Sequence, residues 1–302
     1  TIRADGSSKF ARSHKWGFFP SISGAWRLSE EKFVKKLDVF SDLKLRAGYG
    51  LAGNNRIASY SSLALLESAT YPSGENVSSG YARSGIPSVD LQWESNKTLN
   101  IGIDMGFWGQ RLTITPEFYL NKSSHLLLNS KLPTSSGYST MIRNVGKTRN
   151  IGFDLSISSV NIQSKGFTWT TDFNLSFNKN RIEALSGEDY FLEEAAFGYN
   201  QNTHKIAVDE PLGQFYGFKT LGLYQVEDFT YDAQTGIYTL NDGVPERSDT
   251  TVQPGSWKFA DINNDGVVDD NDRTVIGNAN PDFYGGITNS FSYKGFDLSL
   301  LF

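Results

Sequence analysis

The sequence lacks several features on which large classes of protein depend. It contains no cysteine, and its three histidines, His14, His125 and His204, occur in no metal-site or catalytic-triad spacing. It also contains no G-x-S-x-G motif and no glycine-rich phosphate-binding loop. Paired carboxylates such as Glu193 and Glu194 are interpreted as solvated loop charges. These absences predict that the chain is not an enzyme.

Long hydrophobic runs and basic runs are missing as well. No stretch of eighteen apolar residues occurs, so no transmembrane helix is expected. The formal net charge is −5, which together with the lack of a basic run argues against a nucleic-acid partner. The absence of cysteine fits an exported bacterial protein. The sequence begins at Thr1 without a signal peptide, and we therefore expect it to be part of a longer protein.

What the sequence does contain is alternation of apolar and polar residues. From Leu99 to Phe107 every second residue is apolar, and the same pattern recurs in residues 151–157 and 167–178. A period of two predicts β-strands with one apolar and one polar face. Strands of about ten residues can cross a bilayer at a tilt. The spanning strands expected on this basis are 16–28, 42–50, 97–107, 111–122, 150–160, 167–179, 283–293 and 296–302. The first eight residues are expected to hold the end of another strand.

The predicted connections alternate between short turns and long polar excursions. Short turns such as Trp108-Gly109-Gln110 and Lys294-Gly295 join strand pairs, whereas residues 51–96, 123–149 and 180–282 form the excursions. This alternation is typical of outer-membrane β-barrels, in which the turns are periplasmic and the long loops extracellular. Aromatic residues gather beside the short turns, where an interfacial girdle is expected: Phe107, Trp108, Phe167, Trp169, Tyr293 and Phe296. Ordinary sheet packing is the alternative for each of them.

Strand parity gives each residue an expected direction. Ile103 and Leu155 are predicted to face lipid. The strand-like segment 215–224 falls inside the extracellular excursion 180–282 and is predicted not to span the membrane. The polar residues expected to face the barrel lumen, either lining a path or only pairing across strands, are Lys44, Arg46, Asp104, Glu117, Asp154, Asp172 and Asn174.

The segment DINNDGVVDDND, residues 261–272, predicts a calcium site. Oxygen-bearing side chains occupy loop positions 1, 3, 5, 9 and 12, a glycine stands at position 6, and position 7 offers its backbone carbonyl. The last ligand is an aspartate where an EF-hand has a bidentate glutamate, as in calcium loops of the dockerin type. A metal-free acidic turn is the alternative. The expected ligands of a structural Ca²⁺ are Asp261, Asn263, Asp265, Val267, Asp269 and Asp272, with the turn at Gly266.

Several longer motifs resemble the SusC-like (SusC/RagA) TonB-dependent outer-membrane transporters. RADGSSKF followed by WGFFPSISGAWRLSEEKF, LKLRAGYGLAGNN, LQWESNKTLNIGIDMGF and NVGKTRNIGFDLSIS are similar to successive parts of that family's barrel. DINNDGVVDDNDRTVIGNANPDFYGGITNSFSYKGFDLSLLF resembles its segment near the C-terminus. The resemblance covers essentially the whole chain, in the family's order. It implies an all-β fold, an antiparallel transmembrane β-barrel segment from a roughly 22-stranded barrel.

The same resemblance implies a function and partners. Members of the family import glycans or peptides across the outer membrane of Bacteroidetes-like Gram-negative bacteria, coupled through TonB and capped by a SusD-like surface lipoprotein. The signal peptide, TonB box, plug and remaining strands are absent here, so this chain is expected to supply barrel wall and surface loops. It would contact outer-membrane lipid.

The excursions are expected to bind the lipoprotein and, at some of their residues, an oligosaccharide or peptide substrate. Aromatic residues there could stack on sugar rings or simply pack the loops: Tyr71, Tyr81, Trp93, Tyr216, Tyr231, Tyr238 and Trp257. The rival interpretation is a secreted calcium-binding β-sandwich adhesin or scaffold, because a soluble sandwich also shows alternation with a period of two. Such a protein would have no lipid-facing band.

Overall fold

The computed structural model describes residues 1–194 and 201–302, and nearly all of its regular structure is β. The one α-helix in this described part, α1 (Lys32–Lys35), is a single turn. Among the described residues, no helix is long and apolar enough to cross a membrane. The remaining helical pieces are 3₁₀ turns: η1 (Arg12–His14), η2 (Leu28–Glu30), η3 (Thr134–Ser136), η4 (Val226–Asp228) and η5 (Asp270–Asp272).

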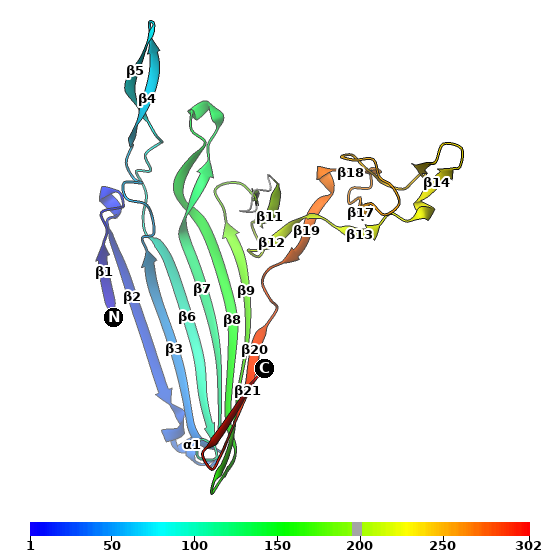
Figure 1. The fold of residues 1–302 in the computed structure, drawn as a ribbon. Coiled ribbons are helices and arrows are strands. Elements are labelled where there is room, and N and C mark those ends of the chain that lie inside the picture. The colour runs from blue at the N-terminus through cyan, green and yellow to red at the C-terminus, as the bar shows by residue number, and fades with distance from the viewer. Residues whose placement is uncertain (195–200) are drawn as a thin grey trace. The chain divides into compact units, whose positions relative to one another are not determined.

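The chain divides into two compact units, residues 1–188 with 282–302, and residues 189–281. The first unit contains a nine-stranded antiparallel sheet in the order β1-β2-β3-β6-β7-β8-β9-β20-β21, shown side by side in Figure 1. Its strands are β1 (Ile2–Gly6), β2 (Trp16–Arg27), β3 (Phe40–Asn54), β6 (Glu94–Phe107), β7 (Leu112–Lys131), β8 (Thr140–Ser164), β9 (Phe167–Ala184), β20 (Tyr284–Tyr293) and β21 (Phe296–Leu301). The sheet does not close on itself within the described residues.

All eight predicted strands are present in this sheet, and β1 is the expected additional one. Strands that follow one another along the chain are neighbours in this sheet, with two interruptions: the separate hairpin of β4 (Leu66–Ser73) and β5 (Asn76–Arg83) between β3 and β6, and the second unit between β9 and β20. Strand β20 pairs directly with β9, from Tyr284 opposite Ser176 to Tyr293 opposite Phe167. The chain therefore returns to the sheet beside the strand it left.

Two predicted strand bounds are wrong. The strands predicted at 111–122 and 150–160 extend into the expected excursion 123–149, because β7 continues to Lys131 and β8 begins at Thr140, and η3 turns the hairpin. The register shifts between Ser123 and Leu126, and His125 adopts a positive φ of 57°. This bulge interrupts the alternation of apolar and polar side chains, which is why the sequence pattern ends too early.

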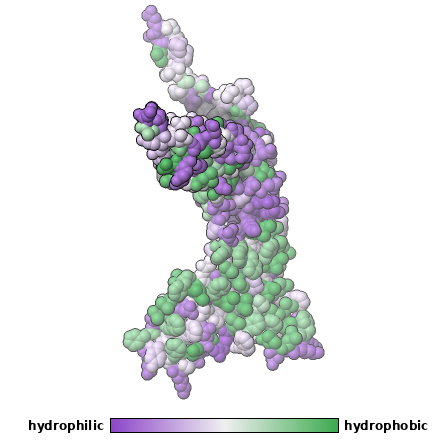
Figure 2. All heavy atoms as spheres, turned by 90° about the vertical axis from the view of Figure 1, so that its right-hand side faces the viewer, coloured by the Kyte–Doolittle hydropathy of each residue, from purple (hydrophilic) through white to green (hydrophobic). Residues whose placement is uncertain are grey.

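The sheet has two ends, distinguished by its connections. We call the end with the β6–β7, β8–β9 and β20–β21 turns and α1 the turn end, and the opposite end, with the β3–β6, β7–β8 and β9–β20 connections, the loop end (Figure 1). On the face that Figure 2 draws, hydrophobic residues form one continuous zone with hydrophilic residues on both sides of it. At the loop end a small core of Phe10, Ile57 and Leu91 packs with Trp93, Leu127 and Ile142.

The second unit is built from short strands. Its largest sheet has the order β10-β11-β12-β19, and three two-stranded pairs, β13–β17, β14–β15 and β16–β18, complete it in the described part of the chain. Tyr224, Phe229 and Val252 form its core. The strands are β10 (Tyr190–Glu194), β11 (Asn202–Ala207), β12 (Gln214–Phe218), β13 (Thr220–Leu223), β14 (Phe229–Asp232), β15 (Ile237–Leu240), β16 (Glu246–Arg247), β17 (Trp257–Phe259), β18 (Val267–Val268) and β19 (Arg273–Asn278). The segment 215–224 thus lies outside the nine-stranded sheet, as predicted.

Candidate functional site

The residues predicted to face the lumen all lie on one face of the nine-stranded sheet. In the register, Lys44 stands opposite Asp104 and Glu117 opposite Asp154. Glu117 also stands opposite Gly102, two residues from Asp104, so these four side chains share a face. Arg46 lies two residues from Lys44 on the same strand and therefore points the same way. Asp172 and Asn174 share this parity, because Asp154 pairs with Ser176. We call this the polar face. Ile103 and Leu155 lie on the opposite, apolar face.

An ion network crosses three strands of the polar face. Arg46 Nε donates to Asp104 Oδ2 at 2.9 Å, and its Nη2 lies 3.3 Å from Glu117 Oε2. Lys44 Nζ adds a longer contact of 3.7 Å to Asp104 Oδ2. The guanidinium reaches both carboxylates because Gly102, its register partner on β6, has no side chain to block it. Lys44 and Arg46 therefore have two carboxylates, Asp104 and Glu117, as partners.

An open groove of about 520 Å³ lies beside this network on the polar face. Tyr119 stands opposite Gly152 in the register, and its ring covers the glycine so closely that an added Cβ would lie 2.1 Å from Tyr119 Cζ. Amide, hydroxyl and carboxyl groups line the groove: Thr98, Asn100, Glu117, Tyr119, Asn121, Asn150 and Asn178. Such a surface offers both hydrogen-bond donors and acceptors to a polar solute.

The predicted calcium loop is organised by its own carboxylates. Asp261 accepts hydrogen bonds from the backbone N–H groups of Asn264 at 2.6 Å and Gly266 at 2.8 Å. Asp272 has no solvent exposure and accepts from the N–H groups of Ile262 at 2.7 Å and Asp269 at 2.8 Å. The bond from Asp269, with those from Ile262 and Asn263, holds the pKa of the Asp272 carboxyl below its ordinary value. Gly266 has a φ of 87°, as the sharp turn requires.

The positions of the predicted ligands relative to one another can be compared with those that a bound metal ion requires. The first and last predicted ligands, Asp261 and Asp272, both accept hydrogen bonds from backbone N–H groups of the loop. Asp265 Oδ2 accepts from Asn263 Nδ2 at 2.9 Å, so the third and fifth loop positions meet. No group of three or more Asp, Glu or His side chains among the described residues is arranged as a closed metal shell. The donors are oxygen-only, which suits a hard cation, and the calcium site stays a prediction.

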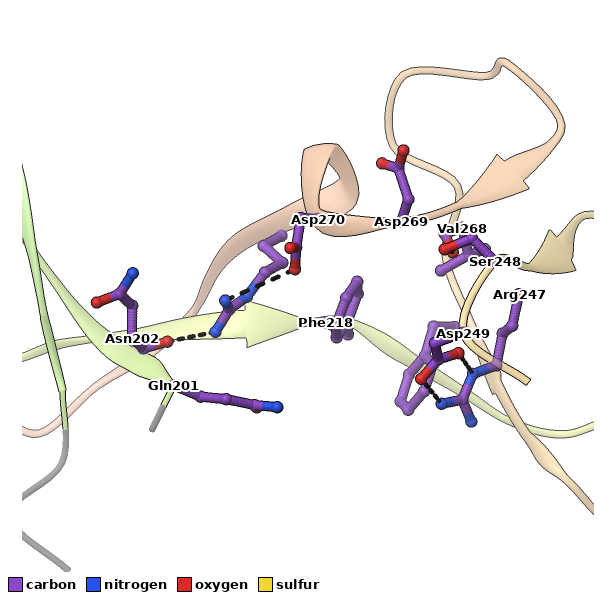
Figure 3. A pocket seen from close by; sticks show the side chains of 11 residues that line it. Gln201, Asn202, Phe218, Arg247, Ser248, Asp249, Val268, Asp269 and Asp270 are labelled. Atoms are coloured by element: carbon purple, nitrogen blue, oxygen red, sulfur yellow. Dashed lines mark hydrogen bonds and ion pairs between the residues drawn. The ribbon is translucent and has the colours of Figure 1, made fainter. Parts of the chain in front are cut away.

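A cavity of about 610 Å³ lies beside the loop in the second unit (Figure 3). Asp269 and Asp270 line it together with two arginines. Arg247 is bidentate to Asp249, at 2.9 and 2.6 Å, and its guanidinium carbon lies 5.2 Å from the Phe259 ring centroid. The other arginine, Arg273, contacts the ring of Phe218 at 5.8 Å, the carboxylate of Asp270 at 3.8 Å and the backbone carbonyl of Asn202. The sequence patterns did not single out either arginine.

The aromatic residues of the excursions fall into two groups. Trp93 packs at 5.1 Å from the ring of Phe10, and Tyr231 at 4.7 Å from that of Tyr238, so these side chains have packing partners within the protein. Tyr216 lies 5.2 Å from the guanidinium carbon of Arg273. In contrast, Tyr81 is 81% and Trp257 59% exposed. Tyr71 and Tyr231 are each 53% exposed, so Tyr231 combines a packing partner with an exposed ring.

A curved set of long antiparallel strands with one polar and one apolar face defines the wall of a transmembrane β-barrel. Residues 1–263 match the family described as "TonB dependent receptor-like, beta-barrel", and the chain belongs to this family.

Individual relatives agree with this assignment. A TonB-dependent receptor of Formosa agariphila is 37% identical over all of this chain and 30% of its own length. The TonB-dependent receptor SusC of Bacteroides thetaiotaomicron is 32% identical over 99% of this chain and 28% of its own length. Among solved structures, the RagAB peptide importer in its closed-closed state has a TM-score of 0.76 and 23% identity, over 99% of this chain and 30% of the other. The chain thus spans less than a third of the relatives it matches.

Proposed function

We propose that this chain forms part of the barrel wall and surface loops of an outer-membrane importer that takes up oligomeric nutrients in a TonB-dependent manner. The supporting observation is the nine-stranded sheet itself, whose polar face carries a matched ion network and a hydrophilic groove while its opposite face is apolar. The 32% identity to SusC supports assignment to the SusC/RagA group. The protein binds and transports, and it has no hydrolytic activity.

Partners and substrate extend this proposal. A SusD-like surface lipoprotein caps the loop end, and the TonB complex acts through parts of the protein outside this chain. The substrate is an oligosaccharide, with a peptide as the alternative. Exposed aromatic rings at Tyr71, Tyr81 and Trp257 support a sugar ligand, because flat aromatic faces bury the apolar faces of sugars. The similar RagAB complex is a peptide importer, which supports the alternative.

Fractionation of the source bacterium tests the location. The full-length protein should occur in the outer membrane and change its electrophoretic mobility on boiling, as folded barrels do. A protein found only in the soluble fraction would instead support the secreted β-sandwich scaffold.

Uptake tests the activity. A strain lacking the gene should fail to accumulate a fluorescent oligosaccharide while still importing the monosaccharide, and the wild-type gene should restore uptake. Restored uptake of a fluorescent oligopeptide only would reassign the substrate, and undiminished uptake of both oligomers in the deletion strain would contradict an import function.

We further propose that loop 261–272 binds Ca²⁺ as a structural ion. Asp261, Asn263, Asp265, Asp269 and Asp272 would hold it, with the Val267 carbonyl. The buried carboxylate of Asp272 supports this, since a charge without solvent exposure gains from a cation partner. Removing calcium from the purified full-length protein should raise the protease sensitivity of residues 255–282.

The matched variants are Asp265→Ala in the loop and Asp242→Ala at an exposed position outside it. Asp265→Ala should lower the bound calcium content and mimic calcium removal, whereas Asp242→Ala should do neither. Equal calcium content in wild-type protein and Asp265→Ala would refute the site.

A further inference from the structure

The register reveals a row of basic side chains that the sequence does not show as a run. Lys97 on β6 pairs with Lys122 on β7, Lys122 pairs with Arg149 on β8, and Arg149 pairs with Arg181 on β9. We call these four residues the basic row. Neighbouring strands lie about 4.8 Å apart, so the row is roughly 14 Å wide.

The basic row lies on the apolar face, at its border toward the loop end. Two residues closer to the turn end on the same strands are Leu99, Leu120 and Ile151, which pair with one another across β6, β7 and β8. Since residues two apart on a strand share a face, the basic side chains point to the same side as this apolar band. On β9, Lys179 stands opposite Ile151 and adds another cation at the border.

The opposite border of the band has a different chemistry. At the turn end, Phe107 packs at 5.1 Å from Phe40 and Trp169 at 5.6 Å from Phe291. In the register row of Phe107, the residues on β7, β8 and β9 are Leu112, Ser159 and Thr171. This row carries no charge. The two borders of the apolar band are thus asymmetric, aromatic at one end and basic at the other.

The charge of the basic row is only partly compensated. Glu183 lies 3.5 Å from Arg149 Nε and 3.9 Å from Lys122 Nζ, so one carboxylate serves two cations. Lys97, Lys122 and Arg149 together with this glutamate carry a formal charge of 3 − 1 = +2. Like charges in directly opposite positions repel. Lys97, Lys122 and Arg181 are exposed and Arg149 is half-buried, so all four can be reached from outside.

We propose that the basic row binds the phosphorylated headgroup of a lipid in the outer leaflet of the outer membrane. The inference rests on the proposed location, which places the loop end at the cell surface. There the row lies where the apolar band meets the headgroup layer. Arginine can hold phosphate through paired N–H groups and lysine adds point charges, so a phosphate-bearing glycolipid headgroup complements the surface in both position and charge.

The test uses full-length protein purified in detergent and lipid A extracted from the source strain, either phosphorylated or treated with phosphatase. The wild-type protein should bind the phosphorylated form about tenfold more tightly than the treated form, by microscale thermophoresis at low salt. The double variant Lys122→Gln/Arg149→Gln should lose most of that preference. The control variant Lys36→Gln/Lys165→Gln removes two exposed charges near the turn end and should keep it.

Three outcomes overturn the inference. They are equal affinity of the wild-type protein for the two lipid forms, an unchanged preference in the double variant, and full competition by inorganic phosphate, which would indicate a site for free anions.

If the double variant does not fold, the single variant Lys97→Gln should still lose about threefold in affinity. A protein that shifts on boiling but shows no phosphate preference contradicts only this inference, whereas a soluble protein contradicts the proposed function.

Discussion

The two units of this chain are stabilised by different kinds of interaction. In the nine-stranded sheet each residue repeats the environment of its neighbours two positions away, so long ladders and two continuous faces determine the structure. In the second unit the strands have two to six residues, and specific side-chain contacts hold the loops, such as Tyr224 Oη on the Pro245 carbonyl at 2.6 Å. The sheet therefore tolerates many single changes that keep a face intact, whereas the second unit depends on individual groups.

The largest expected effect comes from breaking a face of the sheet. Leu155→Arg places a cation in the apolar band, which costs about 2–4 kcal/mol at the bilayer midplane. We expect the full-length protein to lose most of its folded, heat-modifiable form in the outer membrane, and Ile103→Arg to behave likewise. Ser156→Arg is the matched control, because Ser156 is exposed on the polar face of the same strand. Equal folded levels for Leu155→Arg and Ser156→Arg would show that the two faces are assigned wrongly.

A smaller loss of stability is expected from a change at the contact between the Tyr119 ring and Gly152. Gly152→Ala puts a methyl group 2.1 Å from Tyr119 Cζ, so the ring must move and we expect a loss of about 1–3 kcal/mol in unfolding free energy. Gly24→Ala, with no neighbouring atom within 4 Å of the added carbon, should be nearly neutral. Denaturant titrations of the purified protein measure both. Combining Gly152→Ala with Tyr119→Ser should recover stability relative to Gly152→Ala alone, and no recovery would argue against the ring contact as the cause.

In the second unit, the hydroxyl group of Tyr224 is expected to contribute to local stability. Tyr224 is 1% exposed, and removing its Oη in Tyr224→Phe leaves the Pro245 carbonyl without this donor. We expect a local destabilisation of about 1 kcal/mol, seen as faster amide hydrogen exchange in residues 220–256. Tyr238→Phe, at a more exposed ring in the same unit, is the control. Identical exchange in the two variants would show that the hydroxyl contributes nothing.

The sequence predicts the nine-stranded sheet better than it predicts the second unit. Alternation locates eight strands of the nine-stranded sheet and the face of Arg46 and Leu155, because burial repeats over many residues, whereas β1 is expected only as the end of a further strand. It misses the extension of β7 and β8 beyond residue 122, where a bulge near His125 shifts the parity. It also misses the basic row, since parity gives a residue's face but not its partner on the next strand. Short strands such as β14 and β16 contain too few alternations to stand out.

The smallest expected effect is the acid response of the loop around Asp272. Backbone N–H groups hold the pKa of this carboxyl below its ordinary value, so its contribution to stability is present above the unfolded pKa of about 3.9 and is lost as the pH falls through the lower folded pKa. Protease resistance of residues 255–282, assayed with an acid-tolerant protease, should therefore stay constant from neutral pH to about pH 5 and decline only below about pH 4. Asp272→Asn cannot titrate and should be less resistant at neutral pH, with a smaller further decline in acid. A wild-type loop that already loosens near neutral pH would mean that another group controls it, and the second unit would then depend less on this one carboxylate than its hydrogen bonds indicate.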